Sequence, residues 1–136
     1  MRKQIRDTAL QILQTVPEIR LAQIGRRHNL STKQTPAAIV YTDQTQTERI
    51  TFNPEILQHI TQLQVRVILS GTTQSSEDLI DLIVDTIDPQ ILSALRALPN
   101  VIDAIQSELD IDGNGDADAD YLEAKRTYLI EHKQTM

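Results

Sequence analysis

The segment spanning residues 62–69 constrains the fold more than any other, because its apolar residues recur with a period of two. In an extended strand this period places four apolar side chains on one face: Leu63, Val65, Val67 and Leu69. A strand with one apolar face is stable only when a second layer of structure covers that face. The sequence therefore predicts a sheet packed on one side, with this strand ending at Ser70-Gly71.

Segments with helical periodicity flank this strand and could form the covering layer. Residues 3–16 carry apolar side chains at offsets of three and four, and Pro17 should end that helix. A serine cap at 75 or 76 favours a second helix over residues 76–87. Asp88-Pro89 should end this helix and begin a third one. We expect the following side chains to lie against or close to the strand: Ile5, Ile12, Val40, Ile80, Ile83 and Ile87.

Three further segments have the composition of strands. Residues 19–24 alternate weakly, and Pro36–Thr42 is a β-branched apolar run typical of a buried strand. Another extended stretch is expected at 49–52, after a polar break at 43–47 and before a bend at Asn53-Pro54.

Two C-terminal segments, 101–112 and 121–133, fit a helix and a strand equally well. In the first segment, a strand would place Ile105, Leu109 and Ile111 on one half-buried face. In the second segment, a strand would place five residues on one face: Ala124, Arg126, Tyr128, Ile130 and His132. Periodicity leaves both assignments open.

The composition predicts one globular domain over residues 1–136, since 17 Ile and 15 Leu supply enough apolar volume for a single core. The absence of Cys excludes disulfides, thiolate zinc sites and cysteine nucleophiles. No apolar run is long enough for a signal peptide or a membrane span, so we expect a soluble, unexported protein with no membrane partner.

Charge is distributed unevenly along the chain. Residues 1–49 hold eight Lys/Arg and four Asp/Glu, whereas residues 50–136 hold five and fifteen. A net charge of −6 and an aromatic content of 3% argue against nucleic-acid readout, which needs clustered cations and stacking side chains.

The Asp-rich run 110–120 is the one segment with the pattern of a metal site. Its oxygen-bearing residues stand at alternate positions, as in an EF-hand calcium loop: Asp110, Asp112, Asn114, Asp116 and Asp118. Gly115 occupies the turn position, but Tyr121 stands where that loop requires a bidentate Glu. A shorter loop closing on Asp120 would resemble dockerin-type calcium repeats, which occur in pairs, and this chain has one such run. We favour a solvated hairpin turn and keep calcium binding as the weaker alternative.

No catalytic constellation emerges from the sequence. His28, His59 and His132 are far apart, and none has the i, i+4 partner of a helical zinc site. The chain has no nucleophile elbow and no Gly-rich phosphate loop. An acidic row at 78, 81 and 85 suits the solvated face of an amphipathic helix. We therefore expect no enzyme and no cofactor.

The order of the predicted elements resembles the tail terminator proteins of long-tailed bacteriophages, of the minor tail protein U type, and related prophage proteins. The resemblance spans roughly residues 3–133 and rests on an opening helix, the Pro-led strand 36–42, and the alternating strand that leads into a Ser-capped helix. The segments 107–113 and 124–132 resemble the closing hairpin of that family.

This resemblance implies an α+β fold, with a mixed, largely antiparallel sheet, helices packed on one face and a C-terminal β-hairpin whose tip is the Asp-rich run. It also implies a non-enzymatic structural protein that forms a homohexameric ring, caps the tail tube protein and contacts head-completion proteins. Such a protein would lie in the host cytoplasm during assembly and then at the head-proximal end of the virion tail. A relative at another head–tail joint, a domesticated prophage product and a small calcium-binding module are the alternatives. The charge asymmetry suits head-to-tail contacts, for which the strand containing Tyr41 or the C-terminal strand would offer an edge.

Overall fold

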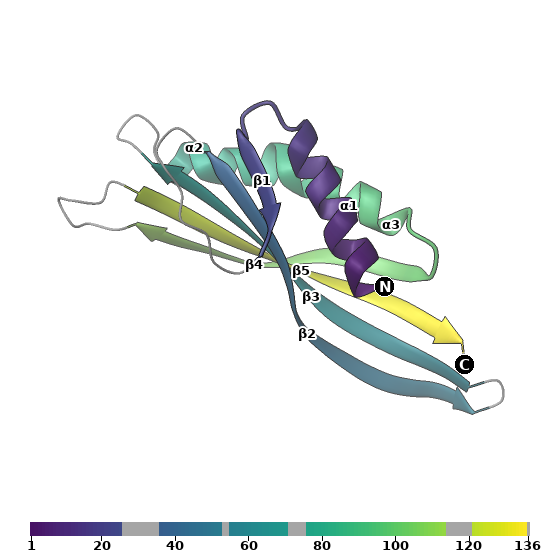
Figure 1. Ribbon diagram of the computed structural model, residues 1–136. Coiled ribbons are helices and arrows are strands. Elements are labelled where there is room, and N and C mark those ends of the chain that lie inside the picture. The colour runs from purple at the N-terminus through teal and green to yellow at the C-terminus, as the bar shows by residue number, and fades with distance from the viewer. Residues whose placement is uncertain (26–35, 53–54, 71–75, 114–120, 136) are drawn as a thin grey trace.

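The computed structural model describes residues 1–25, 36–52, 55–70, 76–113 and 121–135. Its helices lie together on one side of a twisted sheet, as Figure 1 shows. The helical elements are α1 (Arg2–Thr15), α2 (Ser76–Asp81), the π-helical segment η2 (Leu82–Ile87) and α3 (Asp88–Arg96). The strands are β1 (Leu21–Ile24), β2 (Ala37–Phe52), β3 (Glu55–Ser70), β4 (Val101–Gly113) and β5 (Tyr121–Thr135).

The sheet has five strands in the order β1-β2-β3-β5-β4. β1 pairs with β2 in parallel, and all other neighbours are antiparallel. This arrangement confirms the expected α+β fold with a mixed, largely antiparallel sheet and a C-terminal strand pair. In Figure 1, β2, β3 and β5 extend past the helices toward the lower right.

The core lies between the helices and the alternating face of β3. All four apolar residues of that face are buried, together with Ile5 and Val40. Ile83 and Ile87 are fully buried and Ile12 packs at the margin, as predicted. Ile80 is only half-buried, so its predicted place in the core is wrong. Leu79 stands there instead, because 79, 83 and 87 share one helical stripe and residue 80 is rotated away from it.

The polar break expected at 43–47 is wrong, because β2 runs without interruption from Ala37 to Phe52. A register shift between Thr42 and Thr45 accommodates the change of pattern. Beyond this shift, β2 stays paired with β3, which extends past its own apolar segment. In this paired region the Thr45 and Thr61 hydroxyls lie 3.0 Å apart. Cross-strand pairing therefore compensates for the lack of apolar alternation.

The helix end expected at Asp88-Pro89 is also wrong. Ile87 (φ −73°, ψ −51°) and Asp88 (φ −55°, ψ −52°) are both helical, so α2, η2 and α3 form one continuous helical run. The Asp88 amide donates to the Ile83 carbonyl, five residues back, as in a π-helix. Widening the helix at this point accommodates Pro89, which has no amide hydrogen and would crowd an α-helical carbonyl.

The two ambiguous segments are strands. β4 and β5 pair from Val101 opposite His132 to Gly113 opposite Leu122, with register shifts between Val101 and Asp103 and between Gln106 and Leu109. The five residues that a strand would place on one face of β5 are all buried, as the strand alternative predicted. Strand pairing determines the secondary structure of these two segments, which their local periodicity left open.

Candidate functional site

The predicted calcium residues lie only partly within the described chain. Asp110 and Asp112 belong to β4 and are exposed, opposite Lys125 and Glu123 of β5. Asn114, Asp116, Asp118 and Asp120 lie outside the described residues. Within the ranges that the structure describes, no three His, Cys, Asp or Glu side chains gather in a way that could hold a metal ion. Calcium binding at 110–120 therefore stays a prediction.

Asp110 and Asp112 form what we call the acidic strand end of the molecule. Residues two apart in a strand point to the same side, so both carboxylates face solvent together. Asp112 lies directly opposite Glu123, and like charges at opposed positions destabilise a strand pair. Glu123 is itself paired with Arg66 on β3. Arg66 and Lys125 therefore offset part of the negative charge of the acidic strand end, and Asp112 faces a carboxylate rather than a cation.

The strands at the two edges of the sheet are β1 and β4. The expectation of an edge at the C-terminal strand is wrong, because β5 lies between β3 and β4. β1 flanks the strand containing Tyr41 only along Ala37–Val40, so an edge farther along β2 stays a prediction. A strand's position in the sheet depends on partners far away in the sequence, which no local pattern identifies.

β4 exposes three large apolar side chains: Ile102 (45% exposed), Ile105 (46%) and Ile111 (37%). The predicted alternation fails here because the register shifts between Gln106 and Leu109. Ile105 pairs with Leu129 on the helix-free face, whereas Leu109 pairs with buried Arg126 on the face toward the helices. The bulge therefore places Ile105 on the opposite face of the sheet from Leu109, and Ile111 shares the face of Leu109.

A hollow of about 560 Å³ lies at the other end of β5, beside the first turn of α1. Its lining includes Arg2, Gln4, His59, His132 and Lys133. No Asp or Glu is among its described lining residues. We call it the cationic hollow, since Arg2 and Lys133 are positively charged at neutral pH.

Two histidines that are distant in the sequence meet in the wall of this hollow. His59 and His132 are directly opposed on β3 and β5, with their ring centroids 5.0 Å apart and the rings stacked. His59 Nδ1 lies 2.8 Å from the Thr47 hydroxyl, and His132 Nε2 lies 2.9 Å from that of Thr61. Stacked rings do not direct their nitrogens at a common point, so this pair does not form a metal site.

Burial, together with the smaller effect of the neighbouring His59, lowers the pKa of His132 to about 4. His132 is only 4% exposed and is therefore neutral at pH 7. Sequence analysis did not connect the two histidines, because only the register between β3 and β5 brings them together.

Arg2 forms another wall of the hollow and is fixed by β2. Its guanidinium donates to the Asp43 carbonyl at 2.8 Å, to the Thr42 hydroxyl at 3.1 Å and to the Thr45 hydroxyl at 3.2 Å. These bonds hold a positive charge beside the middle of β2. The hollow is thus suited to an anionic group rather than to a cation.

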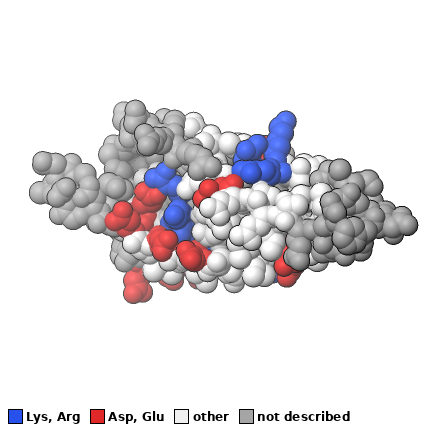
Figure 2. Space-filling model, turned by 90° about the horizontal axis from the view of Figure 1, so that it is seen from below, with Lys and Arg blue, Asp and Glu red and all other residues white. Residues whose placement is uncertain are grey.

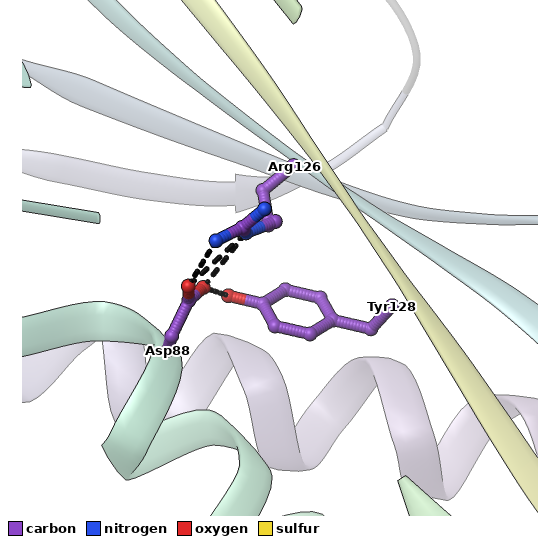
Figure 3. A network of polar contacts seen from close by, with 3 residues as sticks. All are labelled: Asp88, Arg126 and Tyr128. Atoms are coloured by element: carbon purple, nitrogen blue, oxygen red, sulfur yellow. Dashed lines mark hydrogen bonds and ion pairs between the residues drawn. The ribbon is translucent and has the colours of Figure 1, made fainter. Parts of the chain in front are cut away.

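A second polar group lies in the core and connects the helices to β5 (Figure 3). Arg126 Nε donates to the two Asp88 carboxylate oxygens at 3.0 and 3.1 Å, Arg126 Nη2 is paired with the same carboxylate, and the Tyr128 hydroxyl donates to it at 2.5 Å. Asp88 raises the pKa of Arg126, while burial is the main cause that raises the pKa of Tyr128, so both stay protonated. The core encloses these three side chains, and their role is to stabilise the fold.

Acidic and basic side chains also gather in different regions of the outer surface. Figure 2 views the molecule from the side of the sheet opposite the helices. Most Asp and Glu side chains in this view gather toward the left-hand end, with a few basic ones among them, while another basic cluster lies at the upper edge to the right. On the helical elements, Asp78, Asp81 and Asp85 are exposed, as expected for a solvated helix face.

Comparison with protein-family models and with curated proteins finds no match for this chain. None of the helices in the described part is long and apolar enough to cross a membrane. The geometry of the sheet therefore has to support the functional argument.

Proposed function

We propose that this protein is a structural subunit that assembles into a closed ring, with the role of a tail terminator in a bacteriophage or prophage. In this role the ring caps the tail tube protein and presents a surface to a head-completion protein. The protein acts in the host cytoplasm during assembly and stays at the head-proximal end of the tail. The chemistry it performs is binding, without an enzymatic step or a cofactor.

The observation that carries this proposal is the placement of opposite charges at opposite ends of β5. The acidic strand end lies opposite Glu123 and Lys125, and the cationic hollow lies at His132 and Lys133. Two different, complementary surfaces on one subunit favour heterologous contacts, which close into a ring when the rotation between subunits allows it. The element order that resembles tail terminators supports the same conclusion.

Measuring the mass of the protein in solution tests this proposal. Light scattering and sedimentation over a wide concentration range should show a species near six times the 15.4 kDa subunit mass, and electron microscopy should show closed rings. A strict monomer at every protein concentration, salt concentration and divalent-ion condition would contradict it. Repeating the measurement with and without calcium, beside calorimetry, also tests the calcium-binding alternative.

A further inference from the structure

We infer that the cationic hollow of one subunit binds the acidic strand end of a second copy of the same chain. The inference rests on the proposed ring and identifies the two surfaces that meet in it. The ligand chemistry is a pair of carboxylates, Asp110 and Asp112, carried by a β-strand. The binding site is the hollow beside α1, where Arg2, His59 and Lys133 supply the walls.

Each surface carries an electrostatic imbalance that the other would relieve. At the acidic strand end, Arg66 is paired with Glu123 and Lys125 opposes Asp110, so the excess negative charge is that of Asp112, which opposes Glu123 rather than a cation. At the hollow, two cations and two imidazoles gather without an acidic lining residue in the described chain. Bringing carboxylates next to fixed cations favours association and accelerates it.

The two surfaces cannot meet within one subunit. Glu123 and His132 mark their positions on β5 and are nine residues apart, or roughly 30 Å in an extended strand. This distance exceeds the range of screened charge interactions at physiological salt. Any contact between the two surfaces is therefore a contact between two molecules.

Charge reversal in separate variants tests this inference. Asp110→Lys/Asp112→Lys reverses the acidic strand end, and Gln4→Glu/Lys133→Glu reverses the hollow without altering Arg2, which is bonded to β2. Each variant alone should associate about tenfold more weakly or worse, because close interfacial charge pairs contribute more than 1 kcal/mol. An equimolar mixture of the two variants should recover assembly, since each reversed surface then meets its reversed partner.

Two control variants carry the same change of net charge elsewhere. Asp81→Lys/Asp85→Lys lies on the helical side, and Gln11→Glu/Arg20→Glu lies on α1 and beside β1, all at exposed positions. Both controls should assemble like the original protein.

The outcomes separate the two proposals. If the original protein forms rings but the reversed variants assemble equally well, or if mixing them restores nothing, the inferred contact is wrong while the ring stands. If the original protein never associates, both are wrong. Thermal melting of every variant, followed by circular dichroism, verifies that each is folded.

Discussion

At the scale of single residues, the buried carboxylate of Asp88 connects the helical layer to the sheet. The side chains of Asp88 and Arg126 are 6% and 9% exposed. Removing one partner of a buried ion pair leaves the other charged and desolvated, which is more costly than losing the pair. The residue that looked like a helix cap in the sequence is therefore a core residue, and its carboxylate accepts hydrogen bonds from Arg126 and Tyr128.

We expect Asp88→Ala to lower the free energy of unfolding by about 3–5 kcal/mol, because Arg126 would stay buried without its partner. Tyr128→Phe removes one hydroxyl donor and should cost about 1–2 kcal/mol. Urea unfolding measures both. Asp103→Ala is the control, since its pair with Arg96 is about half exposed and should contribute under about 1 kcal/mol. Equal effects for Asp88→Ala and Asp103→Ala would contradict the buried role.

Because His132 is buried, we expect the free energy of unfolding to depend on pH. Its pKa is about 4 in the folded protein, against about 6.5 in an unfolded chain, so the unfolded state binds more protons between these values. The stability from neutral His132 is complete above about pH 6.5 and decreases as the pH falls toward 4. Urea unfolding from pH 7 to pH 4 should show up to about 3 kcal/mol of this loss in the original protein and a shallower loss in His132→Gln. Parallel curves for the two proteins would contradict this assignment.

At the scale of elements, the apolar residues of β3 and β4 lie in different environments. Val67 is fully buried in the core, whereas Ile105 is 46% exposed at the edge of the sheet. Both residues belong to segments in which apolar and polar residues alternate. Only the place of each strand in the sheet, inside it or at its edge, distinguishes the buried residue from the exposed one.

We expect Val67→Asp to cost several kcal/mol and to unfold the domain, because the carboxylate would be buried without a partner. Ile105→Asp makes the same chemical change at an exposed site and should change the melting temperature little. Thermal melting followed by circular dichroism measures both variants. A soluble Val67→Asp protein with a cooperative transition would show that the strand faces are misassigned.

At the scale of the whole molecule, charge is arranged by the fold more than by the chain order. Glu123 and Lys133 both belong to β5, yet they lie beside surfaces of opposite sign. The separation along β5 therefore does not follow the uneven charge of residues 1–49 and 50–136, because Glu123 and Lys133 both lie in the acidic part of the sequence.

Assembly of the proposed ring should weaken as salt concentration rises. Screening shortens the range of charge interactions from about 10 Å at 0.1 M to about 3 Å at 1 M. Sedimentation across this range should show dissociation toward the subunit, while the melting temperature of the subunit changes much less because its core is apolar. Assembly that is unchanged or stronger at 1 M salt would indicate a contact dominated by apolar side chains.

The sequence by itself determined the elements whose apolar residues follow a strong local period. The opening helix, the strand face from Leu63 to Leu69 and the helical stripe through Ile83 and Ile87 are found where the pattern predicted them. Each of these segments has to bury one face, and the period of its side chains identifies that face without knowledge of its partner.

Only the tertiary structure decided the rest, because those features depend on partners distant in the chain. Pairing with β5 brings His59 to His132, and packing against Arg126 and Tyr128 makes Asp88 a core residue instead of a helix end. The bulge in β4 directs Ile105 away from the core, against its local alternation. Strand register and sheet order are set by contacts between distant segments, and a local pattern carries no information about which segments those are.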